Sequence, residues 1–456
     1  MGTERIPRLL TRFALPALLG MLVDALYNIV DRIFVGQIVG ASGIAAIALA
    51  FPCMMLFLAA ALLIGTGAAS RISILLGEKR GKTAEKTLGN AFLLTLLLSV
   101  SLWTFGRTFF REILLLSGAS PTLYDGASEY LSIVMNGMFF FIISFSLSYQ
   151  IRACGSPVYA TTSQVVGAAA NILLDAWFIL GLGMGIRGAA LATVASQFLS
   201  MLWTLSYFCL PKATLKLRAK YIVHPDVSTW KRILAVGIPS CLIHFNFVFV
   251  HAMITNTSSR YGGDLAVSAT GIFMSLDSLL FMPAIAISEA CLPIIGYNFG
   301  SGRIDRIIAT IKIGVLSCTV FYAASFLLLM LRAELLVMMF NSKDKELITL
   351  AARAVRIANM GIPVMGISLV CGALLQGLGR GREGLWLAFV RLGVLLWVPL
   401  IILPKYFGVY GAWGSFMASD FLGSAIAGWS ILHTIRRLRD GVIALPDTEK
   451  PRQEIP

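Results

Sequence analysis

The chain has 456 residues, of which 57% are hydrophobic and only 13% charged, and its mean hydropathy is +0.82. Soluble domains carry about 25% charged and about 45–50% apolar residues, and disordered chains are poorer still in apolar residues, so both classes are excluded. The composition indicates a polytopic protein embedded in the lipid bilayer. The net charge of +14 does not indicate nucleic-acid binding, because the basic residues lie in short loops between apolar runs.

Twelve apolar segments, each long enough to cross a bilayer, follow one another along the chain. They lie at about 13–36, 43–71, 87–106, 127–150, 159–180, 188–210, 233–258, 264–296, 307–331, 349–376, 385–403 and 410–435. The first is a retained span rather than a signal peptide, because it is too long, contains Asp24 and Asp31, and lacks a small-residue cleavage site. The pattern predicts an all-α polytopic membrane protein with twelve transmembrane helices.

The basic residues are distributed unevenly between alternate loops. The N-terminus, every second loop and the C-terminal tail together hold 24 Lys and Arg, whereas the other loops hold 8. Loops rich in Lys and Arg stay on the cytoplasmic side of a membrane. We therefore expect both termini in the cytoplasm and the chain in the cytoplasmic (inner) membrane.

The two halves of the chain repeat a set of landmarks at a nearly constant spacing. Recurring 223 residues apart are Pro16 and Pro239, Gly40 and Gly263, Gly77 and Gly300, and Arg80 and Arg303, with Gln150 and Gln376 226 apart. Since each half has six spans, both share one orientation, which predicts two six-helix lobes related by a pseudo-two-fold axis along the membrane normal. The expected segments are an N-terminal lobe at 1–210, a cytoplasmic linker at 211–232, a C-terminal lobe at 233–436 and a cytoplasmic tail at 437–456.

Acidic residues inside spans are the first candidates for function, because a carboxylate at mid-membrane costs roughly 2.5–3.5 kcal/mol on insertion scales. Six of the 23 acids fall there: Asp24, Asp31, Asp175, Asp277, Glu289 and Asp420. The sequence shows no metal-ligand cluster, nucleophile elbow or phosphate-binding glycine loop, and none of the seven cysteines forms a CxxC pair. These features indicate neither an enzyme nor a cofactor.

Depth counting brings four polar residues of the first half together. Asp31 and Asp175 each lie about five residues before the outer end of their spans, and Thr193 lies as far as Asp175 from the centre of a short hairpin. Asn171 is one helical turn from Asp175 on the same face. Their oxygens suit a hard cation such as Na+ or a shared proton. The alternative is a hydrogen-bonded structural cluster between packed helices.

The same polar face continues inward along the first span. Asp24, Asn28 and Asp31 are spaced at i, i+4 and i+7 and form one stripe. Together with Tyr27, Asp24 and Asn28 are candidates for a polar cavity that contacts substrate.

The polar residues of the second half have no assigned role at this point. His244 and His251 share a face of the seventh span, while Asp277, Glu289 and Asp420 lie on the eighth and twelfth. A second titrating site is one interpretation, and a satisfied polar contact between helices is favoured over it. Arg32 and Arg391 are expected to snorkel or to pair with a carboxylate.

Several short runs recur in a specific order. They are ALPALLGMLVDALYNIVDRIFVGQIVG, ALAFP, GTGAASRISILLG, NILLD and GAALAT in the first half, and GIPSCLI and PIIGYNFGSG in the second. Over nearly the whole chain they resemble the multidrug and toxic-compound extrusion family. The resemblance implies a two-lobed, V-shaped antiporter that exports organic, often cationic drugs or metabolites in exchange for H+ or Na+, with no ATP site. We expect it to function as a monomer.

The resemblance extends to the candidate site in the DinF-like branch of that family. There a carboxylate matching Asp31, the Asn and Asp matching Asn171 and Asp175, and partners matching Ala189 and Thr193 bind the cation. Pro16 matches the proline at which the first helix is proposed to bend. The NorM-like branch uses acids on spans 7 and 10 instead, and here span 7 carries histidines while span 10 has no acid.

Two functions of different substrate class remain open. The first is a cation-coupled exporter of small organic molecules. The second is a flippase for a lipid-linked precursor, which needs a cationic central cavity for its pyrophosphate. The scarcity of Lys and Arg inside the spans favours the exporter. A channel or a membrane enzyme is disfavoured, because neither a symmetric filter nor a catalytic cluster is visible.

Overall fold

The computed structural model describes residues 1–117, 121–341 and 344–443, and within these ranges the chain is helical, with no strand. The first half contains α1 (Ile6–Ile38), α2 (Ala41–Gly77), α3 (Gly81–Thr108), α4 (Phe110–Leu116), α5 (Pro121–Ala153), α6 (Pro157–Asp175), the π-helix η1 (Ala176–Gly181), α7 (Gly185–Tyr207) and α8 (Ala219–Val223). The second half contains α9 (Val227–Gly300), α10 (Ile304–Met338), α11 (Lys345–Ala358), the 3-10 helix η2 (Asn359–Gly361), α12 (Ile362–Gly377), α13 (Gly381–Ala388), the π-helix η3 (Phe389–Val394) and α14 (Leu395–Arg439). Most of the predicted tail, from residue 444 onward, lies outside the described residues.

The described residues contain ten helical stretches that are long and apolar enough to cross a membrane. Two of the ten are double spans, because α9 turns back at Gly263 (φ 65°) and α14 turns back at Gly408 (φ 57°). Counting both arms of each gives the twelve predicted spans. The sequence predicts short loops at these two places, whereas the structure reverses the chain at a single glycine with positive φ, a conformation that only glycine adopts readily.

The internal repeat is visible in the backbone itself. Gly40 and Gly263, 223 residues apart, share almost the same conformation, with φ 84° and ψ −164° at the first and φ 65° and ψ −163° at the second. Gly77 and Gly300 are the last residues of α2 and α9. The two halves therefore place equivalent landmarks at equivalent turns.

The chain folds into two compact units, and each is described here by itself. One comprises Leu15–His244, and the other comprises Met1–Ala14 together with Phe245–Pro456. The unit boundaries thus fall within α1 and α9, whereas the expected lobes divide at the 211–232 linker. The predicted division follows chain order and remains a prediction.

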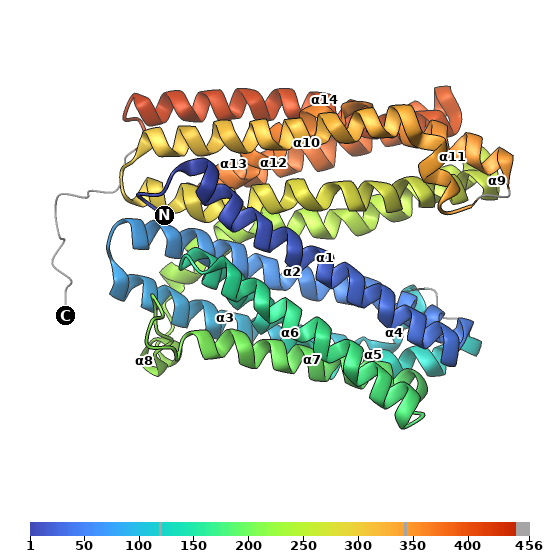
Figure 1. The fold of residues 1–456 in the computed structure, drawn as a ribbon, viewed down its shortest axis with the longest axis horizontal. Helices are drawn as coiled ribbons and strands as arrows, with labels where there is room; N and C mark the ends of the chain where they lie inside the picture. The colour runs from blue at the N-terminus through green and yellow to red at the C-terminus, as the bar shows by residue number, and fades with distance from the viewer. Residues whose placement is uncertain (118–120, 342–343, 444–456) are drawn as a thin grey trace. The chain divides into compact units, whose positions relative to one another are not determined.

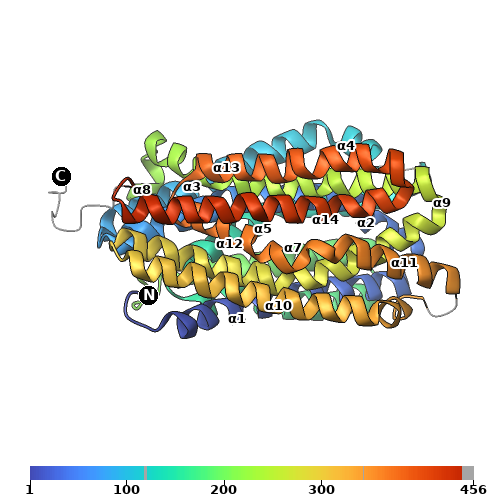
Figure 2. The ribbon, with the colours of Figure 1, turned by 90° about the horizontal axis from the view of Figure 1, so that it is seen from above.

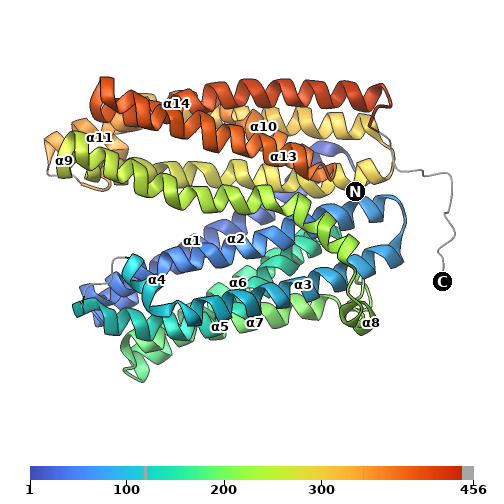
Figure 3. The same ribbon diagram turned by 180° about the vertical axis from the view of Figure 1, so that it is seen from behind.

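In the Leu15–His244 unit, α5 occupies the middle and packs against α2, α3 and α7, as Figure 3 shows from behind. Its apolar core includes residues of all four helix neighbourhoods, among them the fully buried Tyr130 of α5 and Ala189 of α7. The predicted linker is folded against α3, where Arg218 pairs with Glu85 at 2.7 Å. This unit contains every residue of the predicted cation site.

In the other unit, α12 packs against both α10 and α14, which run along its length (Figures 1 and 2). The N-terminal segment is held here, because the Arg306 guanidinium donates to the backbone oxygens of Met1 (2.9 Å) and Glu4 (2.6 Å). Figure 1 shows the N-terminus, the α9–α10 turn and the end of α14 at one end of this unit. These are basic segments, so their shared end agrees with the predicted alternation of loop charge.

Candidate functional site

Asp31 of α1 and Asp175 at the end of α6 meet inside the Leu15–His244 unit. Their carboxyl groups lie within hydrogen-bonding reach of each other and interact electrostatically. Asp31 is 6% exposed and Asp175 is fully buried. Two ionised carboxylates are both acceptors, so this contact becomes a hydrogen bond only when one of them carries a proton. The sequence expectation that these residues share one depth matches the geometry.

The other predicted residues lie on the same helices or on their neighbour. Asn171 is buried one turn before Asp175 on α6, and Thr193 and Ala189 are buried one turn apart on α7. A residue that the sequence reasoning missed joins them: Tyr130 of α5 shares a hydrogen bond with Thr193 and interacts electrostatically with both carboxyls. Four helices therefore contribute polar groups to this cluster.

Several polar atoms of the cluster have no hydrogen-bond partner among the described residues. They are one oxygen of Asp31, both oxygens of Asp175, and the amide oxygen and nitrogen of Asn171. Buried polar groups are normally satisfied, and each exception calls for an explanation. Unpartnered oxygens from two acids and one amide are the ligand chemistry of a hard monovalent cation, or of a proton shared by the acids. The residues present therefore fit either coupling ion.

Directly after Asp175 the helix widens into the π-helix η1. Single π-turns are rare and occur frequently at functional sites, because they interrupt the regular backbone ladder. Here the change of helix type begins one residue after the carboxylate. The sequence gave no warning of it, since hydropathy does not distinguish a π-turn from an α-turn.

The inner stripe of α1 forms a separate polar group. Gln164 of α6 donates to the Asp24 carboxylate at 2.7 Å, and Asn28 donates to the Asp24 backbone oxygen at 2.6 Å. Tyr27 is half-buried and close enough to Asp24 and Asp31 to interact with both. Asn28 is exposed, so the three predicted cavity residues do not all point into the unit. Gln164 was missed by the sequence reasoning.

Pro16, the predicted hinge, lies inside α1 and two residues beyond the point where this helix passes from one compact unit to the other. A proline inside a helix removes a backbone hydrogen bond and crowds the preceding turn. The bend itself remains a prediction.

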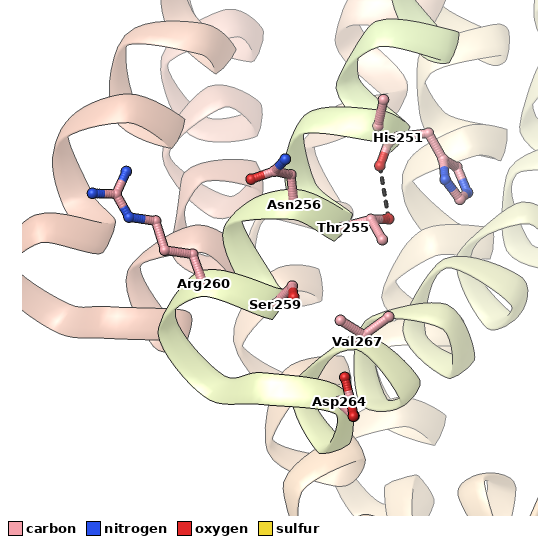
Figure 4. A pocket seen from close by; sticks show the side chains of 8 residues that line it. His251, Thr255, Asn256, Ser259, Arg260, Asp264 and Val267 are labelled. Carbon is pink, nitrogen blue, oxygen red and sulfur yellow. Dashed lines mark hydrogen bonds between the residues drawn. The ribbon is translucent and has the colours of Figure 1, made fainter. Parts of the chain in front are cut away.

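In the second half, the predicted pairing of Arg391 is confirmed, because its guanidinium lies 3.7 Å from the Asp420 carboxylate. The two histidines of the seventh span belong to different compact units, with His244 in one and His251 in the other. His251 lines an open hollow of about 720 Å³ on α9, beside the break at Gly263. Figure 4 shows the polar side chains of this hollow, among them Asn256, Arg260 and Asp264, with the Thr255 hydroxyl donating to the His251 backbone oxygen at 2.9 Å.

Comparison with known proteins identifies the family. The MatE family model matches the chain twice, at residues 16–177 and 239–402, and the two matches begin 223 residues apart, as the landmarks do. The chain belongs to the MatE family. Members of this multidrug and toxic-compound extrusion family are membrane transporters, so this protein is a transporter and not an enzyme. Its assignment to the DinF-like branch remains a prediction.

Relatives and solved structures agree with this assignment. The chain is 26% identical to the multidrug export protein MepA of Staphylococcus haemolyticus (strain JCSC1435), with 96% of each chain covered. It is 25% identical to MepA of Staphylococcus aureus (strain MRSA252), with 93% of each covered. Among solved structures it is similar to a MATE protein in the bent conformation, with a TM-score of 0.90 at 23% identity, covering 96% of this chain and 97% of the other. An outward-facing MATE family transporter gives a TM-score of 0.88 at 23% identity, covering 96% and 97%. These structures support the twelve-helix fold.

Proposed function

We propose that this MatE-family protein is an antiporter that exports organic, often cationic molecules across the cytoplasmic membrane in exchange for H+ or Na+. The observation that supports this most is the buried contact between Asp31 and Asp175, two acids whose oxygens have no donor among the described residues. Such a pair in a membrane protein requires a positive charge. The coupling ion supplies it, and no other cofactor is needed.

The proposed cation site consists of Asp31, Asn171, Asp175, the Ala189 backbone oxygen and Thr193. Tyr130 orients the Thr193 hydroxyl from the neighbouring helix. When the ion binds, the repulsion between the two carboxylates is removed and α1 can move closer to α6. Because α1 also carries Asp24, Tyr27 and Pro16, its adjustment alters the polar cavity where the substrate binds.

Export then follows from thermodynamic linkage. If the bound ion lowers the affinity for the drug, the drug lowers the affinity for the ion by the same factor. An inward ion gradient therefore drives the drug off on the outer side. The MepA relatives are named multidrug export proteins and match along nearly their whole length, which supports a small organic substrate here.

The lipid-precursor flippase is less well supported. Such a protein needs several cationic side chains in its cavity to hold a pyrophosphate. In the described spans the basic residues are committed elsewhere: Arg391 pairs with Asp420, Arg356 pairs with Glu334, and Lys312 is exposed. The exporter therefore remains the better account.

The test uses proteoliposomes that contain the purified full chain and a fluorescent cationic dye, with an imposed pH or Na+ gradient. Asp31→Asn and Asp175→Asn keep the shape of each carboxyl but remove its charge and its titration. We expect gradient-driven dye transport to fall to the level of empty liposomes in both. Asp305→Asn is the matched control, because it makes the same change at an exposed carboxyl at the start of α10. Full transport by Asp175→Asn at equal reconstitution would show that the site is elsewhere.

A further inference from the structure

A second cluster of charged groups lies near the middle of the membrane spans in the Phe245–Pro456 unit. Four helices contribute one residue each: Asp277 from the second arm of α9, Tyr322 from α10, Arg391 from η3 and Asp420 from the second arm of α14. Arg391 and Asp420 form the ion pair already described, each with 16% of its side chain exposed. Asp277 interacts electrostatically with Asp420, and Tyr322 interacts with all three charged groups.

The backbone around the ion pair is packed closely. A Cβ added at Gly361 would lie 2.6 Å from the Asp420 Cβ, and one added at Gly423 would lie 3.1 Å from the Arg391 Cγ. The Ser419 hydroxyl donates to the Arg391 backbone oxygen at 3.4 Å. The pair is therefore held by small residues that let neighbouring helices approach, and it has little room to rearrange without a change in its charges.

The charges of this cluster do not balance. Two carboxylates face one guanidinium, so one negative charge remains when both acids are ionised. Among the described residues, Asp277 has no printed hydrogen bond or ion pair, and the hydroxyl of the fully buried Tyr322 and the Nε of Arg391 have no hydrogen-bond partner. The groups that pack against Asp277 are thus an acid, a base already engaged by that acid, a phenol and the thiol of Cys318 on α10.

We propose that Asp277, together with Asp420, Arg391 and Tyr322, forms a second proton-binding site, in which one proton neutralises the charge that Arg391 leaves uncompensated. A proton fits better than Na+, because a metal ion placed beside the guanidinium would be repelled. Protonated Asp277 offers an O–H donor and leaves Arg391 to Asp420. Ionised Asp277 competes with Asp420 for Arg391. The proton therefore determines the partner of Arg391, and with it the packing between α9, η3 and α14.

This inference rests on the transporter assignment but not on the site at Asp31 and Asp175. The two sites use different residues in different compact units. The sequence interpretation favoured a satisfied structural contact for Asp277 and Asp420. A purely structural pair explains Arg391 and Asp420, but it leaves Asp277 without a counter-charge.

Infrared difference spectroscopy of the purified full chain tests the proposal without transport, since a protonated carboxyl has a carbonyl stretching band that a carboxylate lacks. Between about pH 5.5 and 8 an ordinary carboxyl is fully ionised and contributes no such band. We expect Asp277→Asn to remove one carboxyl band that wild type shows in this range, while Asp305→Asn removes none. Asp175→Asn should leave the Asp277 band in place, which separates this proposal from the first. Tyr322→Phe should keep the band and shift its pH midpoint.

Thermal unfolding in detergent verifies that each variant is folded. An Asp277→Asn spectrum identical to wild type would overturn the proposal, because Asp277 would then carry no proton in this range. Loss of the Asp277 band when choline chloride is replaced by NaCl at constant pH and ionic strength would also overturn it, because the site would then bind Na+.

Discussion

Tyr130 offers a direct test of how the candidate cation site is assembled. Its hydroxyl is the one polar group that α5 contributes to the cluster, and it shares a hydrogen bond with Thr193 in a region where both side chains are buried. In Tyr130→Phe the ring stays in place and only the hydroxyl is lost. The Thr193 hydroxyl is then left without its partner, and a buried group left unsatisfied costs about 1–3 kcal/mol.

That cost should appear as weaker binding of the coupling cation. If Thr193 is a ligand, its hydroxyl must be held toward the ion, and about 1–3 kcal/mol corresponds to a change of roughly 5- to 150-fold in affinity. We therefore expect that the cation concentration displacing half of a bound dye rises by this factor in Tyr130→Phe. The measurement is a dye-binding titration on purified protein against Na+ at fixed pH, and against pH without Na+.

The matched control is Tyr159→Phe, which removes a hydroxyl bonded to Ser206 at 2.7 Å in the same unit but away from the site. Thr193→Val and the double variant complete a double-mutant cycle. If the two hydroxyls act as one unit, the double variant should be hardly worse than either single variant. Effects that add to within about 0.5 kcal/mol, or a Tyr130→Phe titration equal to that of Tyr159→Phe, would refute the reasoning.

Three further predictions concern folding and orientation. Hydrogen bonding to Lys86 and Thr229 lowers the pKa of Asp226, at the start of α9, to about 2, so its stabilising effect is complete above its ordinary value of 3.8 and is lost as the pH falls toward 2; Asp226→Asn should flatten this acid limb of thermal unfolding in detergent and leave the curve above about pH 5 parallel to wild type. Gly237→Ala should destabilise the Leu15–His244 unit by at least the roughly 1–3 kcal/mol of an overpacked core, because its Cβ would lie 1.7 Å from the Leu63 backbone oxygen, while Gly271→Ala meets no atom within 4 Å and should unfold at a temperature close to wild type. Cys introduced at Lys216 on a cysteine-free background should be labelled by an impermeant maleimide only after cells are opened, and labelling in intact cells would reverse the predicted orientation.

The parts of the fold that sequence could predict are those with local signals. Apolar length determines the spans, loop charge predicts their alternation, and the landmarks from Pro16 to Arg303 reveal the repeat. Asp31 and Asp175 could be brought together because depth along a spanning helix follows from counting residues. The meeting of their carboxyls in the structure agrees with that count. Whether the pair binds a cation remains for the transport assay.

The parts that sequence could not predict depend on contacts between helices. Tyr130 lies in a helix that begins at Pro121, several residues before the apolar stretch from which its span was predicted, so its depth was misjudged. Gln164 reaches Asp24 through an interhelical contact that no periodicity encodes. The reversals at Gly263 and Gly408 depend on a positive φ at one residue, which hydropathy does not report. An odd polar residue at the matching depth of a neighbouring span is the signal that could have identified Tyr130.

The number of ions exchanged for each drug molecule connects the two proposed sites. With one ion site, exchange of a singly charged dye for one proton moves no net charge, and a membrane potential gives no drive. With a second proton bound at Asp277, one positive charge enters in each cycle, which adds about 2.3 kcal/mol per 100 mV, or roughly a 50-fold steeper dye gradient. We therefore expect an inside-negative potassium diffusion potential, imposed with valinomycin at equal pH on both sides, to drive export of a monovalent dye from right-side-out proteoliposomes by wild type and by Asp305→Asn. Asp277→Asn should still respond to a pH gradient but no longer to the potential. A wild-type protein indifferent to the potential would mean that the C-terminal cluster binds no transported proton, even if the site at Asp31 and Asp175 is correct.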